Sequence, residues 1–117
     1  MRIFICEDNP IVTMMLEDIV ADLGHSLAGT ADMAEPALRG CLQSGADLAL
    51  VDLDLADGPT GLGLVRDLAH HGIPSIVVSG QVATVPPGHL AAALVAKPID
   101  ERVLAGAIAS VTQREAP

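Results

Sequence analysis

Residues 48–52 read Leu-Ala-Leu-Val-Asp, a run of four apolar residues that ends in a carboxylate. A run this short and this uniformly apolar is typical of a strand that is buried on both faces, as strands of parallel sheets are. The same pattern occurs three more times along the chain. Those runs occupy residues 3–6, 76–78 and 94–96, and the side chains that follow them are Glu7 with Asp8, Ser79 and Lys97.

Helix signals fill the intervals between these runs. Pro10 starts one helical pattern that Gly24 ends, and Gly72 ends another that begins near Leu62. Strands that alternate with helices predict an α/β fold with a parallel sheet. The carboxyl ends of parallel strands form one crevice, so the polar side chains at the run ends are expected to meet there.

The approximate bounds of each element follow from the same signals. Strands are expected near residues 2–6, 26–30, 48–52, 75–79 and 94–96. Helices are expected from Pro10 to Gly24, after a cap at Asp32, over 62–71 and from Ile99 onward, with a tail at 113–117. Pro86, Pro87 and Gly88 interrupt the segment where another helix belongs, so we expect a loop there, with only a short helix at 89–93.

Apolar residues at helical spacing predict which side of each helix faces the sheet. The expected inward residues are Ile11, Met14, Met15, Ile19 and Leu23 in the first helix, Ala37, Leu38, Cys41 and Leu42 in the second, and Val103, Leu104, Ile108 and Val111 in the last. The pair Met14 and Met15 also suits a partner surface. Cys6 and Cys41 match no metal-ligand spacing, so we expect buried or half-buried free thiols.

Length and charge narrow the class of protein. A chain of 117 residues is expected to form one domain, residues 1–117, with no output domain. Six basic and fifteen acidic side chains give a formal charge of −9, which is the wrong sign for direct binding of nucleic acid. The chain carries neither a secretory signal pattern nor an apolar stretch long enough for a bilayer, so a cytoplasmic location away from the membrane is expected.

The residues at the strand ends suit a divalent cation and a phosphoryl group. Crowded carboxylates repel each other unless a cation neutralises them, and Mg²⁺ prefers such oxygen ligands. No His or Cys accompanies the acids, which argues against zinc. Asp52 closes its strand and can form an acyl phosphate as a nucleophile. Ser79 can then donate a hydrogen bond to a phosphoryl oxygen, and Lys97 can supply a positive charge.

The order of an acidic pair, an Asp, a Ser and a Lys-Pro over five β/α repeats resembles the receiver domain of two-component response regulators, across essentially the whole chain. The resemblance implies a flavodoxin-like, doubly wound, five-stranded parallel sheet in the order 2-1-3-4-5 with five helices. It also implies Mg²⁺-dependent transfer of a phosphoryl group to Asp52 from the phosphohistidine of a sensor histidine kinase or phosphotransfer protein. Its implied metal ligands are the side chains of Asp8 and Asp52, the backbone carbonyl of Asp54, and Glu7 through water. The resemblance further implies a cis Lys97–Pro98 bond.

Two departures from the family pattern concern signalling. Three residues before the lysine the family usually carries Tyr or Phe as a switch, and this chain has Leu94. The segment between Ser79 and Lys97 is also short and contains two prolines, which resembles the receivers of alphaproteobacterial stress-response regulators with a shortened or disrupted fourth helix. We expect a downstream partner protein, which the sequence does not identify.

Simpler interpretations and rival functions remain for these residues. Glu7 and Asp8 suit the start of a helix, and Ser79-Gly80 suits an ordinary turn. A pseudo-receiver that binds a partner without phosphate is one alternative, favoured by Leu94. A haloacid-dehalogenase-like phosphatase is another, since Asp52-Leu53-Asp54 resembles its nucleophile motif, but that family places its acidic pair after the lysine. The complete set of polar residues favours the phosphoacceptor.

Overall fold

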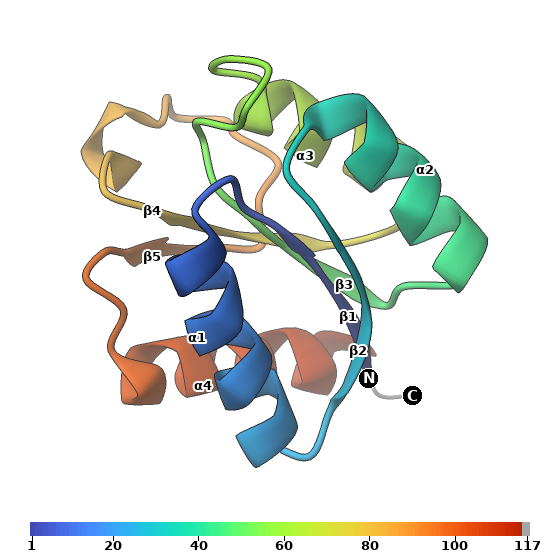
Figure 1. Ribbon diagram of the computed structural model, residues 1–117. Coiled ribbons are helices and arrows are strands. Elements are labelled where there is room, and N and C mark those ends of the chain that lie inside the picture. The colour runs from blue at the N-terminus through green and yellow to red at the C-terminus, as the bar shows by residue number, and fades with distance from the viewer. Residues whose placement is uncertain (116–117) are drawn as a thin grey trace.

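A twisted sheet of five parallel strands forms the centre of the protein (Figure 1). The computed structural model describes residues 1–115. Its strands are β1 (Arg2–Cys6), β2 (Ser26–Ala31), β3 (Leu48–Val51), β4 (Ser75–Ser79) and β5 (Ala93–Ala96). They pair in the order β2-β1-β3-β4-β5, and every pairing is parallel. The predicted α/β class and strand order are confirmed.

Helices cover both faces of the sheet (Figure 1). On one face lie α1 (Pro10–Asp22) and α4 (Glu101–Glu115), and on the other lie α2 (Ala34–Ser44) and α3 (Gly61–His70). Because side chains alternate along a strand, β1 serves both cores: Ile3 and Ile5 pack with α1 and α4, while Phe4 and Cys6 pack with α2 and α3. Because its side chains enter a core on each face of the sheet, β1 is apolar at every position from Ile3 to Cys6.

The only aromatic residue, Phe4, packs against one glycine of β2 and one of α2. A Cβ atom at Gly40 would lie 2.6 Å from the Phe4 ring, and one at Gly29 would lie 2.8 Å from it. Glycine at these two positions lets the strand and the helix close on the ring. Cys6 and Cys41 lie in the same core as buried free thiols, which confirms that prediction.

The predicted inward side of α1 is wrong for three of its five residues, whereas Ile19 is buried as predicted and Leu23 packs partly buried against the same core. Ile11, Met14 and Met15 are 69%, 64% and 43% exposed, and the residues that enter the core are Leu16, Ile19 and Val20. The helix is apolar on most of its circumference, so two stripes at helical spacing compete in the sequence. Packing against the sheet and α4 buries the stripe of Leu16, Ile19 and Val20.

Smaller errors of the same kind occur in α2 and α4. Leu42 and Val103 are exposed, although their neighbours Cys41 and Leu104 are buried as predicted. One residue along a helix is a rotation of about 100°, which carries an adjacent apolar side chain out of the interface. The helix α4 begins at Glu101, after Asp100 accepts hydrogen bonds at its start, and it continues to Glu115, so residues 113–115 are not a tail. Residues 116–117 lie outside the described part.

The cap predicted for α2 is also wrong. The residue before the helix is Met33 rather than Asp32, and its side chain makes no capping hydrogen bond. Instead the backbone N–H of Ala34 donates to Asp57 Oδ2 at 3.1 Å. The cap therefore comes from the loop after β3, 23 residues along the chain.

The chain between β4 and β5 lacks a full helix, as predicted, but its short helix is not at 89–93. A single 3₁₀ turn, Val82–Thr84, stands ahead of the two prolines, and residues 89–93 are not helical. Proline supplies no N–H and disfavours helical backbone before it, so the turn cannot be extended past Val85. Over residues 1–115 there are four α-helices and this turn, rather than the five helices implied by the resemblance. Within the same range no helix has both the length and the hydropathy needed to cross a membrane.

Candidate functional site

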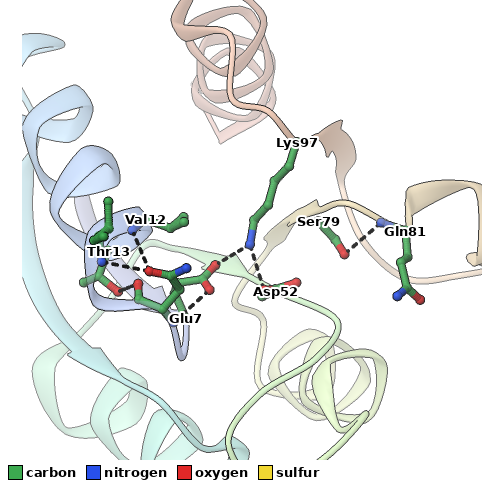
Figure 2. A network of polar contacts seen from close by, with 9 residues as sticks. Glu7, Val12, Thr13, Asp52, Ser79, Gln81 and Lys97 are labelled. Atoms are coloured by element: carbon green, nitrogen blue, oxygen red, sulfur yellow. Dashed lines mark hydrogen bonds and ion pairs between the residues drawn. The ribbon is translucent and has the colours of Figure 1, made fainter.

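The polar residues that end β1, β3, β4 and β5 gather at the carboxyl edge of the sheet (Figure 2). Lys97 Nζ donates a hydrogen bond to Asp52 Oδ2 at 2.9 Å and another to Glu7 Oε2 at 3.0 Å. These residues are 45 and 90 positions from Lys97 in the chain. A single ammonium group thus bridges two carboxylates that come from neighbouring strands.

Backbone pairing that continues past the strand ends positions these side chains. The N–H of Asp52 donates to the carbonyl of Cys6 at 3.0 Å, and the N–H of Lys97 donates to the carbonyl of Ser79 at 2.9 Å. Asn9 caps α1, and its own N–H donates to Glu7 Oε1 at 3.1 Å. Each carboxylate or ammonium group therefore projects from backbone that the sheet or a helix cap holds in place. The Lys97–Pro98 peptide bond is cis.

Burial gives this cluster its electrostatic character. The side chains of Glu7 and Asp52 are 1% and 9% exposed, and that of Lys97 is 23% exposed. Burial raises the pKa of Glu7 above its ordinary value and outweighs the opposing hydrogen bond from Lys97. Burial lowers the pKa of Lys97, but the hydrogen bonds from its ammonium to Asp52 and Glu7 outweigh that effect, so the pKa is raised overall. Lys97 therefore remains charged at neutral pH.

Three carboxylates at this edge could hold a metal ion. Glu7, Asp8 and Asp52 each offer an oxygen, and these oxygens lie within 4.8 Å of one another. Asp8 is exposed to solvent, whereas Glu7 and Asp52 are buried. A hard cation that binds oxygen and keeps some of its waters, such as Mg²⁺, fits a set in which one carboxylate faces solvent.

Ser79 lies beside this cluster but makes no bond to it. Ser79 as a residue is 2% exposed. Its hydroxyl accepts a hydrogen bond from the N–H of Gln81 at 3.2 Å (Figure 2). The start of α3 is held against the same site, because a Cβ at Gly61 would overlap the carbonyl oxygen of Asp52. The loops that follow β3 and β4 thus both begin at the site.

Two predicted site residues stand apart from the carboxylate cluster. Asp54 is exposed, and its side chain does not belong to the group of three acids. Leu94 is 37% exposed on β5, where it pairs with Val77 of β4. The role of the Asp54 carbonyl as a metal ligand stays a prediction.

Sequence reasoning missed the acidic groove beside the cluster. A groove of about 530 Å³ runs between α1 and the end of β2, and Glu17 and Asp32 line it together with Glu7, Asp8 and Met14. Sequence reasoning also missed the structural role of Asp57, an exposed acid in the loop after β3. It accepts from Thr60 Oγ1 at 2.7 Å as well as from Ala34, and the Thr60 hydrogen bond lowers its pKa. No sequence spacing links Asp32 to the acids of the first β/α unit, or Asp57 to Ala34, because each of these pairs comes from two different β/α units.

Comparison with known proteins gives a consistent group of relatives, although no family model matches the chain. The phyllosphere-induced regulator PhyR of Methylorubrum extorquens is 41% identical over 68 residues, which are 57% of this chain and 26% of that regulator. The REC domain of the PhyR response regulator of Erythrobacter litoralis is 30% identical, with a TM-score of 0.82 over 99% of this chain and 93% of that one. SdrG of Sphingomonas melonis is 29% identical, with a TM-score of 0.81 over 95% of each chain. The chain thus spans about a quarter of the curated relative and nearly all of the two solved structures.

Proposed function

The chain belongs to the receiver domains of response regulators, and from this membership we propose that it is a phosphoacceptor in two-component signalling. Asp52 receives the phosphoryl group from the phosphohistidine of a sensor histidine kinase or phosphotransfer protein. Its carboxylate oxygen forms a bond to phosphorus while the P–N bond to histidine breaks, which leaves an acyl phosphate. The observation that carries the proposal is the Lys97 bridge to Asp52 and Glu7 with Asp8 alongside.

The acids around Asp52 suit a Mg²⁺ site. Asp8 and Asp52 would ligate through their side chains, Asp54 through its carbonyl, and Glu7 through water. When bound, the ion supplies positive charge against the phosphoryl oxygens. Lys97 would supply a second positive charge, since its Nζ lies 2.9 Å from Asp52 Oδ2.

Ser79 and Lys97 bind the phosphoryl group in this proposal. The hydroxyl of Ser79 is occupied only as an acceptor from Gln81, so its proton is available to a phosphoryl oxygen. Lys97 Nζ lies 2.9 Å from Asp52 Oδ2. It can exchange its hydrogen bond to the carboxylate for one to a phosphoryl oxygen once Asp52 carries the phosphoryl group. Both residues lie beside Asp52 at the carboxyl edge of the sheet (Figure 2).

The output of the domain is control of a protein–protein interaction, with no reaction catalysed beyond its own phosphorylation and dephosphorylation. Leu94 cannot act as a hydrogen-bonding aromatic switch, so the signal travels from Ser79 into the loop that follows it. Phosphorylation from a kinase also fits the cytoplasmic location that the sequence predicts.

Incubation with acetyl phosphate and Mg²⁺ tests the proposal directly. Mass spectrometry of the intact protein is expected to show one added phosphoryl group. A pseudo-receiver, the second candidate favoured by Leu94, would remain unlabelled under conditions that label a known receiver. Turnover of many equivalents of a generic phosphoester would instead support the phosphatase alternative.

Magnesium is expected to stabilise the protein through Asp8. A ligand at ten times its dissociation constant adds about 1.4 kcal/mol to the free energy of unfolding, which raises the Tm by roughly 5 °C in a domain of this size. Asp8→Asn is expected to remove most of this shift, as measured by calorimetry with and without Mg²⁺. Asp32→Asn is the matched control, since Asp32 lines the same groove outside the carboxylate cluster. An equal loss in both variants would mean that the ion is held by the general acidity of the groove.

Beryllofluoride, which mimics the phosphoryl group, is expected to slow hydrogen exchange in residues 81–90. The segment has only one 3₁₀ turn and begins two residues after Ser79. Mass-spectrometric exchange with and without beryllofluoride measures the change, and α2 serves as the internal reference. If exchange in 81–90 were unaltered while the compound bound, the signal would have to leave the site by another route.

A further inference from the structure

A second pocket lies away from the carboxylates, between α3 and the loop that replaces the fourth helix. Its volume is about 290 Å³. Its walls are made largely by Leu62, Val65, Arg66, Pro86, His89 and Leu90. Four of these six side chains are apolar, and Leu90 is 52% exposed despite its size.

The two polar groups of the pocket are underused. The guanidinium of Arg66 makes one ion pair, to the adjacent Asp67 at 3.7 Å, and both side chains are largely exposed, so this pair contributes little. His89 Nδ1 is buried and has no hydrogen-bond partner among the residues described. Buried ring nitrogens are rarely left without a partner, and a ligand is one way to supply it.

These properties define the ligand by its charge and size. Arg66 offers hydrogen-bond donors to an anion, while Leu62, Val65, Pro86 and Leu90 offer apolar contact. A guanidinium pairs with a carboxylate through two parallel hydrogen bonds. A volume of about 290 Å³ is at the lower end for small-molecule sites, which suits a chain of about eight carbons better than a nucleotide.

We propose that this pocket binds a small amphiphilic carboxylate, with its carboxylate at Arg66 and its alkyl chain against Val65 and Leu90. The site is separate from Asp52 and does not depend on the proposed phosphorylation. It is nevertheless next to the segment that carries the signal. Leu62 also lines a smaller cavity of about 120 Å³, together with Asp54 and Gln81.

Octanoate is the probe for the test, followed by two-dimensional NMR of the backbone amides. We expect saturable shifts confined to the amides of residues 62–66 and 88–90. Octan-1-ol, which has the same chain without the charge, is expected to bind about tenfold more weakly. Arg66→Gln should reduce the affinity for octanoate to that of the alcohol. Arg39→Gln, at an exposed arginine of α2, should leave the affinity unchanged.

Several results would overturn the proposal. Equal binding of octanoate and octan-1-ol would show that the carboxylate does not contribute to affinity. Equal effects of the two arginine variants would show that Arg66 does not bind it. Leu90→Gln provides a second check at an exposed position, and octanoate binding that is insensitive to it would exclude the alkyl site. Concentration-dependent shifts of the same amides without a ligand would assign the face to a second copy of the chain. Tighter binding of the capped peptide Leu-Leu-Glu would assign it to a partner protein.

Discussion

The Asp52→Asn variant is expected to accept no phosphoryl group, with labelling by acetyl phosphate at least about a hundredfold below that of the native protein. An amide oxygen is not a nucleophile at neutral pH, so the acyl phosphate cannot form. The amide oxygen can still accept the hydrogen bond that Lys97 Nζ now donates to Asp52 Oδ2, so the fold is expected to persist. Intact-mass measurement over time, with circular dichroism as the check on folding, gives the result.

Asp54→Asn is the matched control for this prediction. Asp54 lies two residues further along the chain and is exposed, and its proposed contribution is a backbone carbonyl that the substitution retains. Labelling of this variant is expected to stay within about twofold of the native rate. If Asp52→Asn were labelled normally and Asp54→Asn were not, the phosphoacceptor would be Asp54.

The Lys97→Met variant is expected to lose both stability and phosphorylation. Removing one partner of a buried ion pair leaves a charge without compensation and costs about 3–5 kcal/mol. The side chain of Lys97 is 23% exposed, so water screens part of the interaction, and about 2 kcal/mol is the expected loss at pH 7. Urea denaturation measures the free energy of unfolding, and Arg102→Met at an exposed site of α4 is the control.

The loss of free energy of unfolding in Lys97→Met is expected to be smaller in acid, because Glu7 then becomes protonated. Its pKa is raised in the folded protein, so this group contributes stability that is complete below its ordinary value of 4.5 and is lost as the pH rises through the folded pKa. Without Lys97, protonation of Glu7 removes one of the two uncompensated charges. The difference between native and Lys97→Met protein is therefore expected to be smaller at pH 5 than at pH 7. Adding Glu7→Gln should recover part of the stability at pH 7 and flatten this pH dependence.

The fold was largely predictable, because its strands carry their signal locally. A strand buried on both faces must be apolar at every position, and the runs that end at Cys6, Val51 and Val78 show that pattern. The run that ends at Ala96 was expected to be buried in the same way, but β5 is an edge strand in which only Val95 is buried. Parallel strands present their carboxyl ends at one edge. The convergence of Glu7 and Lys97 from positions 90 residues apart follows from that rule.

The helix faces were less predictable for a physical reason. In α1 the sequence offers Ile11, Met14 and Met15 as readily as Leu16 and Val20, since both sets recur at helical spacing. The free-energy cost of exposing either set depends on what the helix packs against. That surface is formed by the sheet and α4, so it cannot be read from the sequence of α1 alone. In the same way, the cap of α2 comes from Asp57. This residue is 23 positions from Ala34 in the sequence, so no local pattern indicates that the two are in contact.

The sequence by itself thus determined the alternation of strands and helices, the sheet edge at which the polar residues meet, and the identities of those residues. Only the tertiary structure decided how they pair. Lys97 bridges Asp52 and Glu7 rather than one of them, and Glu7 is buried while Asp8 beside it faces solvent. Local patterns record the period and polarity of each segment. Distances and burial arise from packing between segments, and these set the charge balance of the site.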